Sequence, residues 1–178
     1  DRMEMILLPT TSCYAIKDGS GLAAVKTNYD FSGWTGDLTN FNDWGTIALT
    51  PKRMFGENSD TGTQHITDGT SNTVALAEQT HNVIDGAPNA WGYRGWVQFG
   101  LDLNYYGINR FDVFLGAWYT GNRDRIVGRL AEWGTSGSLH PGGINITLGD
   151  ASVRFISETT DVTVLKQICT ISGAEAIK

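Results

Sequence analysis

The clearest alternation of apolar and polar positions lies in residues 138–157, "SLHPGGINITLGDASVRFIS". The apolar residues that alternate with polar ones on the two sides of a turn are Ile144, Ile146 and Leu148, then Val153 and Phe155. A period of two residues is typical of a half-buried strand. The pattern therefore predicts antiparallel strands over 144–148 and 152–156. We expect the buried face of this hairpin to carry Ile146, Leu148, Val153 and Phe155.

Two registers of this hairpin keep its apolar residues on one face. A two-residue turn at 150–151 pairs Leu148 with Val153, whereas a turn at 149–150 pairs Ile146 with Val153. The apolar pattern is the same in both, so it does not choose between them. Turn chemistry favours the second, because glycine adopts the positive φ of such a turn more easily than alanine.

Two other segments have a periodic pattern. Residues 74–78, "VALAE", alternate large and small side chains after a turn at Asp68 and Gly69, which predicts a short strand. Residues 158–173 predict a helix that Thr160 or Asp161 can cap. The residues expected on the inner face of this helix are Val162, Leu165, Ile168 and Cys169.

Composition adds a fold class to these elements. The 178 residues correspond in size to a single domain, residues 1–178. The chain has 22 glycines and only 18% charged residues, and residues 83–136 hold 11 of its 19 Trp, Tyr and Phe residues. This mixture predicts a mainly β (α+β) fold of antiparallel sheets with short helices and an aromatic, glycine-rich insert.

Charge and hydropathy exclude several classes of partner. The net charge of -6 opposes binding to nucleic acid and to anionic membranes. No stretch approaches the roughly 18 apolar residues of a membrane-spanning helix. The two cysteines have no Cys-x-x-Cys spacing, which excludes a zinc ribbon or a thioredoxin-like motif. The sequence does not decide whether Cys13 and Cys169 form a disulfide.

His140 and Asp150 are the first residues to consider for catalysis. The extended strand between them covers roughly 20 Å, so they lie at opposite ends unless the bend at 141–143 folds back. We expect His140 to hydrogen-bond a neighbouring segment and Asp150 to satisfy backbone groups of its turn. The chain also has no Gly-x-Ser-x-Gly, His-Glu-x-x-His or phosphate-loop motif, and we predict no catalytic residue.

Three segments resemble the prepilin-type H-x9-D-G domain of bacteria, a family also catalogued as family 10 solute-binding proteins. They are "DGTSNTVALAE" at 68–78, "KTNYDFSG" at 26–33 and "HPGGINITLGD" at 140–150, and residues 157–177 resemble the family's C-terminus. The motif residues of this chain are Asp68, Gly69, Ser71, Asn72, His140, Gly142, Gly143 and Asp150. Ala151 stands where the motif has its final glycine, which weakens any inference about the geometry of that turn.

The resemblance implies a non-enzymatic, extracellular or cell-surface protein: a pilin-like or pseudopilin subunit of a surface or secretion assembly. Its implied partners are like chains or other pilin-type subunits. Its relatives contact the membrane through a methylated N-terminal helix, which we expect this chain to lack. Because that helix covers one face of the sheet in pilin-like folds, we expect the segment 83–136 or another chain to cover the face here.

An alternative function is a secreted module that binds or processes carbohydrate. Aromatic rings can stack on sugars, and the candidates are Trp91, Trp96, Trp118 and Tyr119. The competing interpretation is that these rings fill the core. A hydrolase would need two carboxylates ~5 to 9 Å apart. The candidates by location are Asp85, Asp102, Asp112, Asp124 and Glu132, and their spacing selects no pair.

We predict no metal site or other cofactor. The histidines His65, His81 and His140 lie on separate segments, which argues against zinc. Calcium is a weaker possibility, with oxygen ligands from Asp60, Asp68 and Asp150, but the chain has no EF-hand loop.

Overall fold

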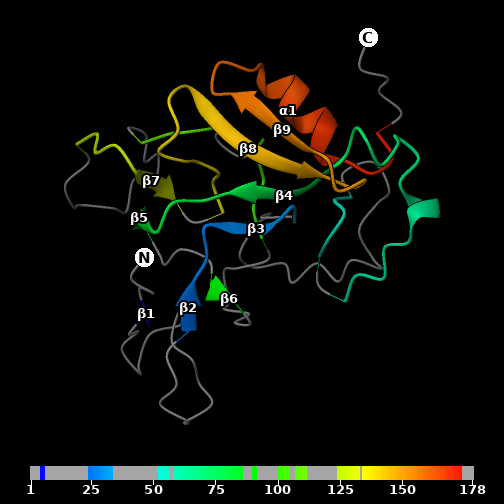
Figure 1. Ribbon diagram of the computed structural model, residues 1–178, viewed down its shortest axis with the longest axis horizontal. Coiled ribbons are helices and arrows are strands. Elements are labelled where there is room, and N and C mark those ends of the chain that lie inside the picture. Colours follow the sequence, from blue (N-terminus) through cyan, green and yellow to red (C-terminus); the bar gives the residue numbers. More distant parts are fainter. Residues whose placement is uncertain are drawn as a thin grey trace.

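The computed structural model describes residues 5–6, 24–33, 52–56, 58–85, 90–91, 100–104, 107–111, 124–132 and 134–173. Its largest sheet has four antiparallel strands in the order β3-β4-β8-β9 (Figure 1). These strands are β3 (Tyr29–Phe31), β4 (Val74–Glu78), β8 (Gly143–Leu148) and β9 (Val153–Ser157).

Smaller elements surround this sheet. One small antiparallel sheet joins β1 (Met5–Ile6), β2 (Ala24–Lys26) and β6 (Ala90–Trp91). A parallel pair joins β5 (Asn82–Asp85) and β7 (Arg129–Glu132). The helices are the 3-10 turn η1 (Thr63–His65) and α1 (Val162–Cys169). The predicted mainly β fold is confirmed. None of the helices described here is long and apolar enough to cross a membrane.

The predicted hairpin is present as β8 and β9, but both predicted registers are wrong. The turn has three residues, because Leu148 N donates to Ser152 O at 2.9 Å. Asn145 therefore lies opposite Phe155 and Thr147 lies opposite Val153. A shift of one residue moves a side chain to the other face of a sheet. Val153 and Phe155 are accordingly 65% and 52% exposed, and their predicted burial is wrong.

The third turn residue, Ala151, has a φ of 66°. In this left-handed region an L-residue with a Cβ is strained, whereas glycine is not. Three-residue hairpin loops commonly place glycine at this position. The geometry explains how a glycine of the H-x9-D-G motif would serve this turn.

We therefore expect Ala151→Gly to raise the free energy of unfolding by about 0.5 to 1 kcal/mol. The gain is smaller than the strain relieved because glycine also adds entropy to the unfolded chain. Urea denaturation measures the change, and Ser71→Gly is the control, because Ser71 is exposed and has no positive φ. A loss of stability in Ala151→Gly would contradict the observed turn.

The core lies between the four-stranded sheet and α1. From the sheet it takes Val74, Ala77, Ile144, Ile146 and Leu148, and from elsewhere Leu101, Leu103, Ile108, Leu165, Ile168 and Cys169. Three of these residues, Leu101, Leu103 and Ile108, come from the predicted insert at 83–136. The described part of the insert thus contributes to the core on the α1 side of the sheet.

The helix begins at the predicted cap. The Asp161 carboxylate accepts a hydrogen bond from Thr163 N at 2.7 Å, a geometry that satisfies a free amide at a helix N-terminus. Leu165, Ile168 and Cys169 are buried as predicted. Val162 is 50% exposed, so its predicted place on the inner face is wrong. It is the first residue of α1, and it lies next to the exposed cap rather than over the sheet.

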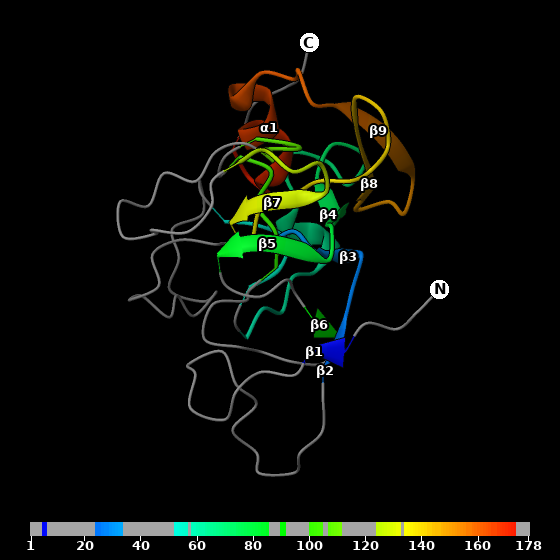
Figure 2. The ribbon, with the colours of Figure 1, turned by 90° about the vertical axis from the view of Figure 1, so that its left-hand side faces the viewer.

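The other side of the sheet forms a surface that we call the open face, made of Tyr29, Phe31, Leu76, Val153 and Phe155. In β4 a register shift between Val74 and Leu76 turns Val74 toward the core and Leu76 away from it. Figure 2 shows α1 on one side of β8 and β9. Four of its five residues are large apolar side chains that are 41–65% exposed.

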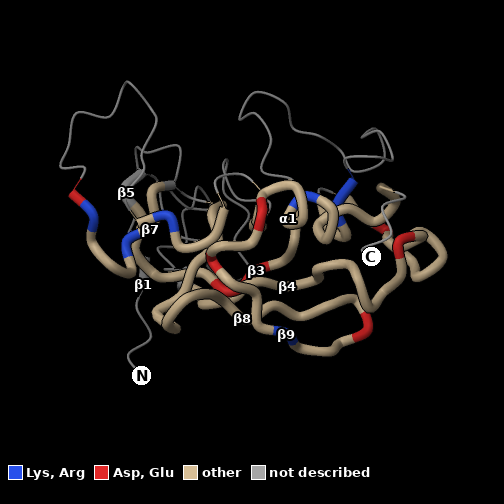
Figure 3. The backbone as a smooth tube through the Cα atoms, turned by 90° about the horizontal axis from the view of Figure 1, so that it is seen from above, with Lys and Arg blue, Asp and Glu red and all other residues tan. Residues whose placement is uncertain are grey.

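Charged residues are few on the open-face side of the sheet, where Glu78 of β4 lies opposite Tyr29. Arg154 is the only Lys, Arg, Asp or Glu on β8 and β9 (Figure 3). It pairs with Ile146, whose side chain lies in the core, so alternation points Arg154 away from the open face. This side of the hairpin therefore offers an uncharged surface to solvent.

Candidate functional site at Glu78 and His140

The motif at 68–73 forms a turn that holds the end of the chain described here. The Asp68 carboxylate accepts a hydrogen bond from Gly173 N at 2.7 Å. Asn72 Nδ2 donates to Asp68 O at 3.1 Å, while Ser71 is exposed. At Gly69 the backbone has a φ of 95°, which glycine accepts without strain. These contacts tie β4 to the segment that follows α1.

The same turn binds the β8–β9 turn. Asp150 N donates to Thr70 O at 3.1 Å and Gly149 N donates to Thr73 O at 2.8 Å. The Asp150 carboxylate accepts from Ser152 N and Ser152 Oγ, and these hydrogen bonds lower its pKa. Two motifs that are far apart in the sequence thus meet at one end of the sheet. Their observed contacts are backbone and turn contacts.

His140 lies at the other end of β8 and contacts Glu78 instead of Asp150. Its Nε2 is 3.1 Å from Glu78 Oε1. The glycines beside it shape the bend: Gly142 has a φ of 80°, and a Cβ on Gly143 would collide with the Ile156 carbonyl. The expected hydrogen bond of His140 to a neighbouring segment is present, and the partner is one that the sequence did not identify.

Glu78 is the centre of a hydrogen-bond cluster. Its carboxylate accepts from Tyr29 Oη at 2.9 Å, from Asn145 N at 2.7 Å and from Asn145 Nδ2 at 3.3 Å, besides the His140 ring. The side chain of Glu78 is 6% exposed and that of His140 is 54% exposed. The cluster joins β3, β4, β8 and the loop before β8.

The electrostatics of the cluster keep Glu78 ionised. Burial alone raises the pKa of this carboxyl, but hydrogen bonds from the Asn145 backbone, Tyr29 and the Asn145 side chain, together with the His140 charge, lower it below its ordinary value. The hydrogen bond to Glu78, followed by burial, raises the pKa of Tyr29. Glu78 is thus an acceptor that holds its neighbours, not a proton donor near neutral pH.

The cluster orients an imidazole, and its described contacts supply no activated nucleophile. Ser138 Oγ donates to Gly143 O at 2.9 Å and accepts from His140 N at 3.0 Å, so both of these hydrogen bonds are to backbone groups. In the described part of the chain, no group of three or more His, Cys, Asp or Glu residues is placed to hold a metal ion.

The remaining candidates are not brought together in the described residues. Asp102 is buried and its carboxylate lies 2.9 Å from Arg53 Nη2, so it belongs to a core ion pair. Asp124 and Asp60 are exposed, and only the backbones of Asp85 and Glu132 are described. The candidate residues that lie outside the described part of the chain are Trp96, Asp112, Trp118, Tyr119 and Cys13.

Three other candidates have described positions. Trp91 ends β6, and its side chain is not described. Cys169 is a free thiol whose burial raises its pKa to about 12. His65 is exposed in η1, where its Nδ1 accepts a hydrogen bond from Gly62 N at 3.1 Å. None of these observations adds a residue to the cluster at Glu78.

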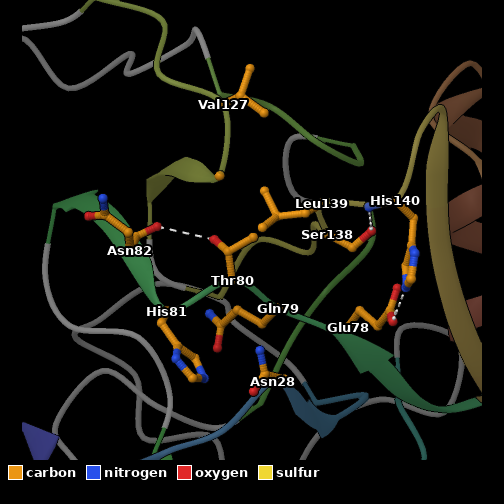
Figure 4. Close-up of a pocket in the computed structure, with 11 residues that line it drawn as sticks. Asn28, Glu78, Gln79, Thr80, His81, Asn82, Val127, Ser138, Leu139 and His140 are labelled. Carbon is orange, nitrogen blue, oxygen red and sulfur yellow. Dashed lines mark hydrogen bonds and ion pairs between the residues drawn. The ribbon is translucent and has the colours of Figure 1, made fainter. Parts of the chain in front are cut away.

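A pocket of about 530 Å³ opens beside the cluster (Figure 4). Glu78 and His140 form one side of it. Residues 79–82, which follow β4, also line it with Asn28, as do residues 127–128 and 138–139. His81, one of the scattered histidines, lines this pocket, so the fold brings two of the three histidines to one cavity.

Comparison with known proteins identifies a family. A family model described as "Protein of unknown function (DUF1559)" and labelled SBP_bac_10 matches residues 17–163, which is most of the chain and includes Glu78, His140 and both motif turns. No curated protein and no solved structure matches the chain significantly. The chain therefore belongs to the DUF1559 family of proteins of unknown function.

Proposed function

We propose that this protein is an extracytoplasmic, non-enzymatic subunit of a pilin-like or pseudopilin assembly, and that it docks onto its partners through the open face. The observation that carries the proposal is the exposure of Tyr29, Phe31, Val153 and Phe155 on one side of a single sheet. The H-x9-D-G resemblance and the solute-binding label of the family support a location outside the cytoplasm.

The open face is suited to a binding role because of its chemistry. Large apolar side chains gather on β3 and β9, and the half-buried Leu76 on β4 lies between them with the half-buried Asn145 and Thr147 on β8. Soluble monomers rarely expose contiguous apolar patches beyond a few hundred Å² unless the patch binds something. Burying this surface against a partner would release apolar area from water, which is the main driving force of association.

The dimensions of the open face match an apolar helix. From β3 to β9 there are three strand spacings of about 4.8 Å, which gives a width of roughly 14 Å. An α-helix with its side chains is about 10 to 12 Å across. A helix from a like chain or from another pilin-type subunit would therefore cover the face, as the N-terminal helix does in pilin-like folds.

Sedimentation velocity at micromolar concentration, together with binding of a hydrophobic dye, tests the proposal. We expect self-association of the wild type or dye binding, and we expect Phe155→Lys to weaken either one about tenfold or more. Phe155 is 52% exposed, so this change leaves the core intact. Val162→Lys is the matched control, because Val162 is 50% exposed but belongs to α1.

Two outcomes would contradict the proposal. A clean monomer that binds no dye would show that the open face is covered within the chain. Equal losses in Phe155→Lys and Val162→Lys would show that association does not use the open face.

A further inference from the structure

The pocket beside Glu78 has the size and the lining of a small-molecule site. Its volume of about 530 Å³ lies within the usual range of ligand pockets, about 300 to 1,000 Å³. Its polar lining includes the amides of Asn28, Gln79 and Asn82 and the hydroxyl of Thr80. A side-chain amide both donates and accepts hydrogen bonds, which suits a ligand that carries hydroxyl groups.

The charges around the pocket argue against an ionic ligand. None of the described residues that line it is Lys or Arg, so the groups that could pair with a phosphate or a carboxylate are the imidazoles of His81 and His140, and His140 already pairs with Glu78. Glu78 is the one carboxylate in the lining, and both of its oxygens already accept hydrogen bonds from Tyr29, Asn145 and His140. A cationic ligand would therefore compete with donors that Glu78 already has.

The backbone around the pocket argues against an extended peptide as the ligand. Gln79 N donates to Asn28 O, and Glu78 O accepts from both Gly137 N and Ser136 Oγ. Peptide recognition by strand addition requires free backbone groups along an edge. Here the side chains, not the backbone, offer the hydrogen bonds.

An apolar lip completes the pocket. Val127 and Leu139 are 61% and 74% exposed, and both line the cavity. Figure 4 shows Val127 on the side opposite Asn28, with His140 and Glu78 on a third side. A sugar ring has the complementary character, because its hydroxyl edge forms hydrogen bonds while its C–H face packs on apolar side chains.

We propose that this pocket binds a neutral sugar of one or two rings, with its hydroxyl groups on Asn28 and Asn82 and its C–H face on Val127 and Leu139. The site is distinct from the aromatic residues considered from the sequence, and it goes beyond the proposed assembly role. The site adjoins the open face, because Glu78 in the pocket wall accepts a hydrogen bond from Tyr29 of that face.

Titration calorimetry and ligand-observed NMR test the site on the full chain. The neutral panel is glucose, galactose, mannose, N-acetylglucosamine and cellobiose, and the charged comparisons are glucuronate and glucosamine. We expect saturable binding of at least one neutral sugar, and weaker binding of its charged analogue. Asn28→Ala and Asn82→Ala should each weaken it about fivefold, the equivalent of one lost hydrogen bond.

The variants are chosen so that the fold survives. Asn28 and Asn82 are both exposed, and Gln64→Ala is the control because Gln64 is an exposed amide on η1, outside the pocket. Phe155→Lys should leave sugar affinity unchanged, which separates this inference from the proposed assembly. Failure of every neutral sugar to bind would overturn the inference, as would binding that Asn28→Ala and Asn82→Ala do not change.

Discussion

Leu148→Ala is expected to lower the free energy of unfolding by about 2 to 5 kcal/mol. Leu148 is 3% exposed on the core side of β8. Truncating it removes buried methyl groups and leaves a cavity that the neighbouring side chains fill only in part. Urea denaturation followed by tryptophan fluorescence measures the loss.

The matched control for this prediction is Val153→Ala on the paired strand. Because Val153 is 65% exposed, its truncation should change stability by no more than about 0.5 kcal/mol. The contrast tests the three-residue turn, since either predicted two-residue turn would bury Val153 with Leu148. Similar losses in the two variants would contradict the observed register, and an unchanged midpoint for Leu148→Ala would contradict the strand itself.

The alternation of side chains predicts the strands of this hairpin but not the turn that joins them. Ile144, Ile146 and Leu148 are buried as their spacing indicates. The length of the turn depends on Ala151, which adopts a positive φ that alanine disfavours. A glycine at position 151 would have indicated a three-residue turn, but alanine does not. The exposure of the side chains in the following strand could therefore not be predicted either.

The helix was easier to predict because its signals are local. Asp161 caps the first turn through its own carboxylate, and Leu165 and Ile168 lie on the inner face at helical spacing. The same helical spacing also predicts that Val162 lies on the inner face of the helix. A helical pattern gives the direction of a side chain but not how far the neighbouring sheet extends beneath it, and at Val162 the helix is exposed.

The cluster at Glu78 could not be predicted from sequence spacing, because its members come together through strand pairing. Glu78 and His140 are 62 residues apart. They meet because β4 pairs with β8, which follows the loop of His140, and because Glu78 lies opposite Tyr29 on the side of the sheet away from the core. The signal in the sequence was Glu78, an ionisable residue at the end of an apolar strand. Burying a charged side chain costs free energy unless it has hydrogen-bond or charge partners.

We expect Glu78→Ala to lower the free energy of unfolding at pH 7 by about 1.5 to 3 kcal/mol, the range of a hydrogen bond to a charged group. The substitution leaves Asn145 N and Tyr29 Oη without the acceptor that they have in the wild type. His140→Ala should cost less than about 1 kcal/mol, because an ion pair with an exposed partner is weak in water. Chemical denaturation of both variants measures the two losses.

The effect of Glu78 should also depend on pH, with a sign set by its lowered pKa. A carboxyl whose pKa is lower in the folded state than in the unfolded chain stabilises the fold above the unfolded value, near pH 4.3. That contribution is lost as the pH falls through the lower, folded value. The difference in stability between wild type and Glu78→Gln should therefore decrease as the pH falls below about pH 4. A difference that grows as the pH falls below about pH 4 would show that Glu78 is protonated in the native cluster and donates to Tyr29 Oη or to the His140 ring.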